Sequence, residues 1–489
     1  MFTNTGAAVR WSDSTRSLTQ RQRRIAALYQ GQGLPRVTGA APRVAVVGAG
    51  LAGLAAARLL AKAGCDAQLY EAGDRAGGRI RTEHGRSDPQ AVWEMGGEFI
   101  DGDHDDMLAL ADALDVELLD TLPPGEESLS PLFHFGGQRY GDEQLASALA
   151  SIAPRLAADA GAISSRPGFQ AATAADRRFD RLSITDYVDG LKLDRWLQQL
   201  IEVSFTTLYG LDAGEQSALN LLTFIGGAPD AGSRILGASD ERFKVRSGSQ
   251  QLTDRLAGDL GERIAFGRRL VRLRRAAAGW VLGFDRGKDQ HADAVVLALP
   301  FTLLRQVDMG DLLPPPHSLA VRTLGYGTNA KLLLGTHRRI WREQGFDGNC
   351  RSDGALQSAW DCSRLRGRGE GVFTVYLGGR SGLALGQEDE STQAARHAAL
   401  ADTLFPGFEA AWTGEMRRAC WTDEPLARGS YTCYRPGQWT TLAGVERQPL
   451  PGGLYFAGEH CATRSQGYMN GAAETGRAAA MAILKQVAG

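Results

Sequence analysis

A strand, a glycine-rich turn and a helix follow one another near the start of the chain. Residues 43–47 form an apolar, β-branched run, and the Ala- and Leu-rich stretch that ends at Gly64 has the composition of a helix. The turn between them reads Gly48-Ala49-Gly50-Leu51-Ala52-Gly53. In this spacing the first glycine makes a tight turn, the second lets the backbone approach a pyrophosphate, and the third packs the helix on the strand. The pattern predicts a Rossmann-type unit whose helix N-terminus faces phosphates.

An acidic residue supports this interpretation and narrows the ligand. Glu71 directly follows the apolar stretch 67–70 and lies about 20 residues after the glycine turn, where an acid binds ribose hydroxyl groups. No Arg directly follows Glu71 to hold a 2′-phosphate. We therefore expect an adenine dinucleotide without that phosphate, either FAD or NAD.

The residues after Glu71 separate these two dinucleotides. The chain continues as Ala72-Gly73-Asp74-Arg75-Ala76-Gly77-Gly78-Arg79, and a second glycine pair follows in Glu94-Met95-Gly96-Gly97-Glu98. Together these segments closely resemble the flavin-containing amine oxidase family, which includes the monoamine and polyamine oxidases. The resemblance implies that the first glycine pair and Arg79 lie along the FAD pyrophosphate, where Arg can bind phosphate with two hydrogen bonds.

Motifs near the C-terminus extend the resemblance. A segment from Trp421 to Tyr431 is similar to the one beside the isoalloxazine ring, and the pair Gly458-Glu459 ends an apolar run. Gly467-Tyr468-Met469 precedes a helix predicted to start near Gly471, whose dipole would stabilise the negative charge of a reduced flavin. The resemblance implies that Tyr431 and Tyr468 form an aromatic cage around the substrate amine.

Carried over residue by residue, the resemblance also implies the contacts with FAD. Val271, in a small predicted meander between 264 and 284, would offer backbone hydrogen bonds to the adenine. The residues expected at the cofactor are Gly48, Gly50, Leu51, Ala52, Gly53, Glu71, Ala72, Gly78, Arg79, Met95, Gly96, Gly97, Glu98, Val271, Trp421, Gly458, Glu459, Gly467, Tyr468 and Met469. Family members with covalent FAD carry Cys at the position of Ser430, and Ser cannot form that thioether, so the resemblance implies noncovalent FAD.

The remaining candidate catalytic residue is Lys331, in the apolar run 330–334. By residue type alone it could be a charge that protects an edge strand, and Tyr431 and Tyr468 could be core residues. The resemblance implies instead that Lys331 holds a water near flavin N5, where it assists hydride departure or oxygen activation. We expect His460 to be structural, and Glu98 to line an entrance that attracts cationic amines.

Composition limits the class of partner. The chain has 489 residues, with 54 basic and 56 acidic side chains and a formal net charge of -2. This balance gives no field that recruits nucleic acid or an anionic membrane, so we expect a small-molecule partner. The six cysteines form no C-x-x-C pair, and we predict neither a metal site nor disulfides. No apolar run reaches the roughly 18 residues of a membrane span.

Residues 1–39 form an N-terminal arm with six Arg and one acid. Arg23 and Arg24 precede only four apolar residues, too few for the core of a secretory signal. We therefore expect a surface arm with a short amphipathic helix at 19–29, in a cytoplasmic protein.

The resemblance spans about 43–485 and implies an α/β fold with two discontinuous domains. One is a Rossmann-like FAD-binding domain of the glutathione-reductase-like type, and the other is a substrate domain of mixed sheet and helices. We expect the FAD-binding domain to comprise 40–121, 236–304 and 417–489, and the substrate domain to comprise 122–235 and 305–416.

The implied activity is that of a flavin-dependent amine oxidase. A hydride passes from the carbon beside an amine nitrogen to flavin N5, water hydrolyses the imine to an aldehyde, and O2 reoxidises the flavin to give H2O2. Three alternatives remain: an L-amino-acid oxidase, an amine dehydrogenase with a protein electron acceptor, and a flavin-binding protein without turnover. An amino-acid substrate needs a cation for its carboxylate, and in L-amino-acid oxidases of this superfamily an Arg is expected shortly after the second glycine pair. This chain has the acidic stretch Glu98-Phe99-Ile100-Asp101 there, which favours an amine without a carboxylate. A homodimer is left open.

Overall fold

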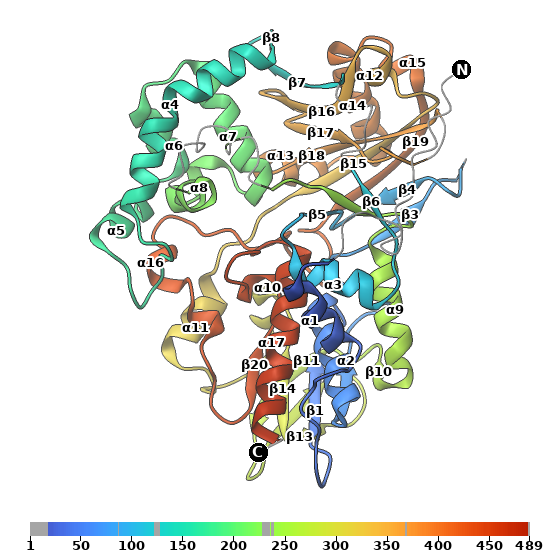
Figure 1. The fold of residues 1–489 in the computed structure, drawn as a ribbon, viewed down its shortest axis with the longest axis vertical. Helices are drawn as coiled ribbons and strands as arrows, with labels where there is room; N and C mark the ends of the chain where they lie inside the picture. Colours follow the sequence, from blue (N-terminus) through green and yellow to red (C-terminus); the bar gives the residue numbers. More distant parts are fainter. Residues whose placement is uncertain are drawn as a thin grey trace.

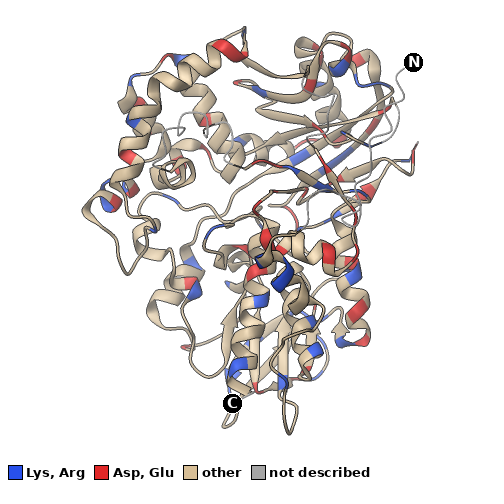
Figure 2. Ribbon diagram, in the orientation of Figure 1, with Lys and Arg blue, Asp and Glu red and all other residues tan. Residues whose placement is uncertain are grey.

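The computed structural model describes residues 18–86, 88–121, 128–226, 235, 239–366 and 369–487. Two halves meet across the middle of the molecule (Figure 1). The lower half contains a parallel sheet and the chain's last helix. The upper half contains a large sheet on one side and a group of helices on the other. Lys and Arg are mixed with Asp and Glu over both halves (Figure 2), as the near-zero net charge predicts.

The lower half is organised around a five-stranded parallel sheet with the order β10-β2-β1-β14-β20. Its strands are β1 (Arg43–Val47), β2 (Asp66–Tyr70), β10 (Ile264–Ala265), β14 (Ala294–Leu297) and β20 (Leu454–Phe456). Three stretches of chain far apart in sequence therefore build one sheet. This arrangement confirms the predicted Rossmann-like α/β fold.

Both faces of this sheet are covered, because alternate residues of β1 enter different cores. Val44 and Val46 pack with α2 (Leu51–Ala63) and α17 (Met469–Val487), whereas Ala45 and Val47 pack with a three-stranded meander. The meander comprises β11 (Leu270–Arg275), β12 (Trp280–Phe284) and β13 (Gln290–Ala292). Also in this half lie α3 (Asp105–Ala113), α9 (Gln250–Leu260), α10 (Phe301–Leu304), α11 (Pro315–Thr323) and α16 (Trp439–Leu442). The paired strands β3 (Thr82–His84) and β4 (Val92–Glu94) lie where the two halves meet, and Trp93 of β4 packs against Leu333 of the upper half.

The upper half contains a seven-stranded mixed sheet with the order β19-β15-β18-β17-β16-β7-β8. The strands are β7 (Ser130–Phe135), β8 (Gln138–Tyr140), β15 (Ala330–Thr336), β16 (Phe346–Ser352), β17 (Ser358–Asp361), β18 (Gly371–Leu377) and β19 (Trp412–Cys420). One face packs on α12 (Ile340–Glu343), α13 (Gly379–Leu385), α14 (Glu390–Leu404) and α15 (Phe408–Ala411). The opposite face looks toward the lower half.

A helical group and a small sheet complete the fold. The group contains α4 (Asp142–Ala162), α5 (Ala174–Asp180), α6 (Ile184–Leu191), α7 (Arg195–Tyr209) and α8 (Ala218–Ile225). The small sheet, with the order β5-β9-β6, lies where the two halves meet and comprises β5 (Phe99–Ile100), β9 (Phe243–Val245) and β6 (Leu118–Asp120).

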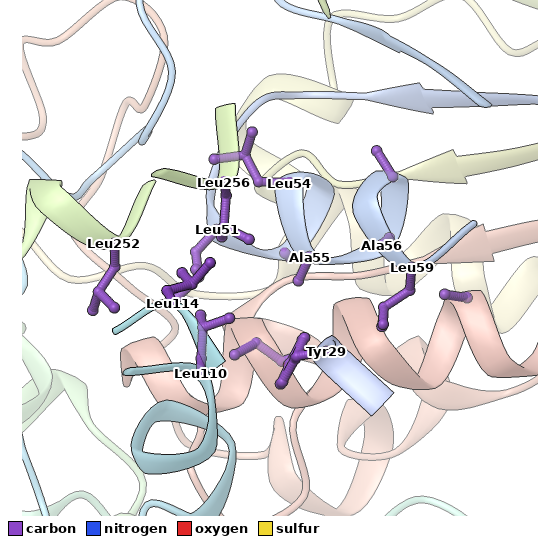
Figure 3. Close-up of a cluster of buried hydrophobic side chains, with 14 of the residues drawn as sticks. Tyr29, Leu51, Leu54, Ala55, Ala56, Leu59, Leu110, Leu114, Leu252 and Leu256 are labelled. Atoms are coloured by element: carbon purple, nitrogen blue, oxygen red, sulfur yellow. The ribbon is translucent and has the colours of Figure 1, made fainter. Parts of the chain in front are cut away.

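The N-terminal arm docks on the lower half. The helix predicted at 19–29 is present as α1 (Gln20–Tyr29), and the Thr19 hydroxyl caps it by accepting from the Gln22 N–H. Tyr29 is completely buried against α2, α3 and α17 (Figure 3). The arm is therefore part of the core from residue 18 onward, and residues 1–17 lie outside the described chain.

We retain the division into FAD-binding and substrate domains as a proposal. Its boundaries at 122 and 236 fall on residues outside those that the structure describes. Over the described parts of the chain, no helix combines the length and apolar character needed to cross a membrane.

Candidate active site

A cavity of about 1470 Å³ lies between the two halves. Ligand sites commonly occupy about 300–1,000 Å³, so this one has room for a dinucleotide and a second molecule. All but two of the residues expected at the cofactor or in catalysis line it. The exceptions, Gly53 and Met95, lie directly behind its wall, where Met95 is 1% exposed and its carbonyl accepts a hydrogen bond from the indole N–H of Trp421, 3.3 Å away.

The glycine turn forms the cavity wall at the N-terminus of α2. Gly48 has φ +100°, and a Cβ on Gly53 would lie 1.9 Å from the carbonyl oxygen of Gly48, so neither position accepts a side chain. A Cβ on Gly50 would meet no protein atom within 4 Å and would project into open space at the cavity wall. Together with the unpaired first N–H groups of the helix, this cradle fits a pyrophosphate.

Glu71 holds this turn in shape. Its carboxylate accepts hydrogen bonds from the Ala49 N–H at 2.7 Å and the Gly73 N–H at 2.8 Å, and Glu71 and Ala72 line the cavity. Each carboxylate oxygen accepts one of these bonds and keeps a further lone pair, so Glu71 can still accept a bond from a ribose hydroxyl in the cavity.

Glu459 joins the two glycine-rich ends of the site. One carboxylate oxygen of this buried residue lies 3.1 Å from the guanidinium of Arg79, and the other accepts from the Gly467 N–H at 3.0 Å. Arg79 also donates to the carbonyl oxygen of Ser430. The ion pair of Arg79 with Glu459 therefore holds the motifs around Arg79, Ser430 and Gly467 against one another.

Val271 occupies a β-bulge in the meander. The pairing of β11 with β12 passes from Leu270 to Arg272 and omits Val271, which lines the cavity. Its carbonyl oxygen accepts a hydrogen bond from the Asp308 N–H at 2.9 Å. Of the two backbone groups expected to bind the adenine, the carbonyl therefore already has a partner within the protein.

His460 lies in the cavity wall, and neither of its ring nitrogens has a hydrogen-bond partner among the described residues. The ring packs edge-on against Phe301, at 4.5 Å between centroids, and burial lowers the pKa of His460 to about 4. The imidazole is therefore neutral. A neutral ring of this kind fits the structural role expected for it.

Lys331 is the centre of a buried charge network. Its ammonium lies 3.0 Å from a carboxylate oxygen of Glu98 and donates to the carbonyl oxygens of Glu94 and Gly96 at 3.0 and 2.9 Å. These three contacts use all three N–H groups of the ammonium. Any water held by Lys331 would have to replace one of them.

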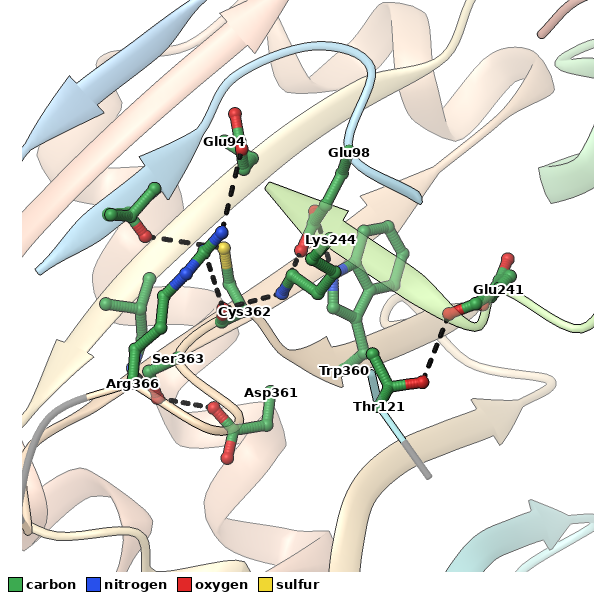
Figure 4. A network of polar contacts seen from close by, with 12 residues as sticks. Glu94, Glu98, Thr121, Glu241, Lys244, Trp360, Asp361, Cys362, Ser363 and Arg366 are labelled. Atoms are coloured by element: carbon green, nitrogen blue, oxygen red, sulfur yellow. Dashed lines mark hydrogen bonds and ion pairs between the residues drawn. The ribbon is translucent and has the colours of Figure 1, made fainter. Parts of the chain in front are cut away.

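The other oxygen of Glu98 pairs with Lys244, 2.6 Å away, and the indole N–H of Trp360 donates to Glu98 at 3.1 Å (Figure 4). Although burial opposes ionisation, the two lysines lower the pKa of Glu98 to about 2. Two ammonium groups already neutralise this carboxylate, which is 4% exposed. The expectation that Glu98 attracts amines at an entrance therefore does not fit, and we assign it to the support of Lys331 instead.

The two tyrosines that are expected to form the cage, Tyr431 and Tyr468, lie at the same end of the cavity as Lys331. The Tyr431 hydroxyl lies 2.7 Å from that of Tyr376, and a Cβ on Gly467, the neighbour of Tyr468, would touch the Tyr431 ring at 3.4 Å. Tyr468 packs edge-on against His104 at 5.1 Å between ring centroids. Burial raises the pKa of both Tyr431 and Tyr468 well above the ordinary value, so both phenols stay protonated.

Sequence reasoning missed Tyr376, Lys244, Glu241 and Arg351, of which all but Lys244 line the cavity. No motif contains them. Tyr376 could have been predicted as a site residue only from the register in which β18 pairs with β15, because it lies directly opposite Lys331 in that register.

A Rossmann-type half whose glycine cradle fits a pyrophosphate, open to a second space lined by tyrosines and a buried lysine, defines a dinucleotide-dependent oxidoreductase. The sequence matches the family of flavin-containing amine oxidoreductases over residues 51–484. The chain belongs to this family and is a flavin-dependent amine oxidoreductase.

Individual relatives agree with this assignment. An L-amino acid dehydrogenase from Synechocystis sp. is 27% identical over 467 residues, which cover 90% of this chain and 94% of that protein. The flavin-containing amine oxidase B of Homo sapiens is 25% identical over 468 residues, with coverages of 90% and 86%. The solved structure of cyclohexylamine oxidase from Brevibacterium oxydans shares the fold, with a TM-score of 0.80 at 22% identity over 91% of this chain and 99% of that one.

Proposed function

We propose that the protein oxidises an amine bound between Tyr431 and Tyr468, in the part of the cavity that Lys331 borders. The observation that carries this proposal is the convergence of both tyrosines and a fully hydrogen-bonded ammonium on one cavity with the dinucleotide cradle. Aromatic faces attract a cationic amine and orient it without consuming hydrogen bonds.

Bound FAD would supply the acceptor for the hydride that leaves the carbon beside the amine nitrogen. The amine loses a hydride and a proton, and water hydrolyses the resulting imine to an aldehyde. The chain's own contribution is positioning and charge. Lys331, held by Glu98 and two carbonyl oxygens, keeps a fixed positive charge beside Gly96, and the N-terminus of α17 adds a favourable dipole.

We further propose noncovalent FAD, O2 as the electron acceptor with release of H2O2, and a cytoplasmic location. Ser430 supports the noncovalent binding, because its hydroxyl donates to the side chain of Asn329 at 2.7 Å and offers no thiol for a thioether. A homodimer stays open.

An L-amino acid is the second candidate substrate, and one observation favours it. Arg351 lines the cavity and offers a guanidinium that can bind a carboxylate. The similarity to an L-amino acid dehydrogenase points the same way.

The test is to purify the protein with its flavin and add amines and L-amino acids separately without oxygen, while the visible absorption of the flavin is followed. The proposal predicts that amines bleach the flavin and that air restores the colour with one H2O2 per turnover. Bleaching by amino acids alone would favour the second candidate. Slow recovery in air would favour a dehydrogenase with another acceptor, and a flavin that no compound bleaches would contradict the proposal.

A further inference from the structure

Glu241 presents its carboxylate to the cavity, and no residue that the structure describes pairs with it. Glu241 lines the cavity and is exposed to that space, while the surrounding protein shields its carboxyl from bulk water. Burial raises the pKa of its carboxyl to about 7 despite the nearby charge of Arg351. Among the described residues, none donates a hydrogen bond to this carboxylate or forms an ion pair with it.

The backbone holds Glu241 in this position against its preference. Its φ is +43°, in the left-handed region that L-residues with side chains rarely adopt. The Glu241 N–H donates to Asp101 at 3.1 Å, and the Ser239 hydroxyl donates to the same carboxylate at 2.7 Å. The Thr121 hydroxyl donates to the Glu241 carbonyl oxygen at 3.3 Å, the bond drawn in Figure 4. Three bonds therefore anchor the loop and leave the side chain directed at the cavity.

The seven-stranded sheet of the upper half contributes one continuous row of side chains to the cavity. Lys331 pairs with Tyr376, Tyr376 with Ser358, and Ser358 with Arg351, so these residues share one face across four neighbouring strands. All four line the cavity. With about 4.8 Å between strands, the row is about 14 Å long from Lys331 to Arg351. The cavity thus extends well beyond the end that contains the tyrosine cage.

Glu241 lies within electrostatic reach of both ends of this row. Its charge acts on Tyr468 of the cage and on Tyr376 in the row, and also on Arg351 at the far end. Because the described residues donate no hydrogen bond to this carboxylate, its negative charge inside the cavity costs free energy unless a cation pairs with it. A ligand that brings a positive charge to this place would remove that cost.

We propose that Glu241 is a binding subsite for a second cationic group of the substrate, so that amines with two ammonium groups are preferred to monoamines of the same length. The proposal rests on the proposed amine oxidation, since the first ammonium group occupies the tyrosine cage. It assigns Glu241 a role in specificity and no role in the chemical step.

The test compares three linear substrates of matched length: 1,6-diaminohexane, hexylamine and 6-aminohexanoate. The wild-type protein should have the highest kcat/KM for the diamine. In Glu241→Gln, the ratio of kcat/KM for the diamine to that for hexylamine should fall about tenfold to a hundredfold, the range for a lost charge-assisted hydrogen bond. The control is Glu262→Gln, an exposed residue outside the cavity, in which the ratio should stay at the wild-type value.

An unchanged ratio in Glu241→Gln would overturn the proposal, as would a preference of the wild type for hexylamine or for 6-aminohexanoate. A binding experiment separates this failure from failure of the proposed function. Calorimetric titration of the dithionite-reduced, FAD-loaded protein requires no turnover. Tighter binding of the diamine than of hexylamine to the wild type, lost in Glu241→Gln, would support the subsite even if no amine bleached the flavin; equal binding would overturn it.

Discussion

At the scale of single residues, the site depends on buried charges that neutralise one another. Glu98 lies between two ammonium groups, so its removal would leave both without a counter-ion, whereas removal of Lys244 would leave a complete pair with Lys331. Removing one partner of a buried ion pair typically costs about 3–5 kcal/mol because an uncompensated charge stays behind. The three positions therefore differ in their expected effect on stability.

We predict that Glu98→Gln lowers the free energy of unfolding by about 3–5 kcal/mol at neutral pH, and that Lys244→Met has a smaller effect. The pKa of Glu98 in the folded protein is about 2, below its ordinary value. Its contribution is therefore complete above the ordinary carboxyl pKa and is lost as the pH falls toward 2. Urea unfolding between neutral and acid pH measures this, and a wild-type advantage that did not shrink in acid would contradict it.

A second pH dependence follows from Glu241. Its carboxyl pKa of about 7, raised by burial, means that the negative charge is gained as the pH rises through neutrality. The charged groups that act on it are Arg351, Asp101, Glu98 and Lys331. We predict that the ratio of kcat/KM for 1,6-diaminohexane to that for hexylamine rises from about pH 6 to about pH 8 in the wild type and is flat in Glu241→Gln. A parallel rise in both proteins would assign the titration to another group.

At the scale of elements, two glycines of the turn before α2 have different roles: Gly53 is needed for packing, and Gly50 for ligand binding. A Cβ on Gly53 would collide with the Gly48 carbonyl oxygen, whereas a Cβ on Gly50 would enter only the cavity. We predict that Gly53→Ala destabilises the protein by about 1–3 kcal/mol and impairs FAD binding. Gly50→Ala should keep the thermal stability of the FAD-free protein and still weaken FAD binding at least tenfold.

Flavin fluorescence titration and thermal unfolding of the FAD-free proteins measure the two effects. Unweakened FAD binding in Gly50→Ala would show that the pyrophosphate lies elsewhere.

The elements also show which parts of the fold and of the site can be predicted from the sequence. The cofactor half could be predicted because its contacts come from backbone at fixed spacing, as in the turn from Gly48 to Gly53. The substrate end of the cavity could not be predicted from the sequence. Its residues Lys331, Tyr376 and Arg351 become neighbours only through the pairing of β15, β18, β17 and β16. The pairing of Glu98 with Lys244 likewise joins residues far apart in the chain, and the sequence around Glu98 suggested an entrance instead.

At the scale of the whole molecule, the N-terminal arm and the last helix close the lower half. The Tyr29 hydroxyl lies 3.1 Å from Asp106 of α3 and 3.2 Å from the Ala473 carbonyl oxygen of α17, and Arg477 of α17 pairs with the same Asp106 at 2.6 Å. One buried side chain thus connects three elements from both ends of the chain (Figure 3).

We predict that Tyr29→Ala costs about 3–5 kcal/mol of unfolding free energy, as for other large buried side chains. Tyr29→Phe should cost only about 1 kcal/mol, since it loses a hydrogen bond and keeps the packing. Differential scanning calorimetry of the two variants distinguishes these effects. Equal losses would mean that the hydroxyl, not the packing of α1, secures the arm.

In the proposed function, one cavity brings an amine, a flavin and the charge of Lys331 together. The most direct test of this proposal is an anaerobic stopped-flow experiment in which wild-type and Lys331→Met proteins, both loaded with FAD, are mixed with 1,6-diaminohexane while the flavin absorption is recorded. We predict rapid bleaching in the wild type and bleaching at least a hundredfold slower in Lys331→Met. A rate effect of this size is within the range measured for groups that act on the transition state. Equal bleaching rates in the two proteins, or a wild-type flavin that the amine does not bleach, would contradict the proposal.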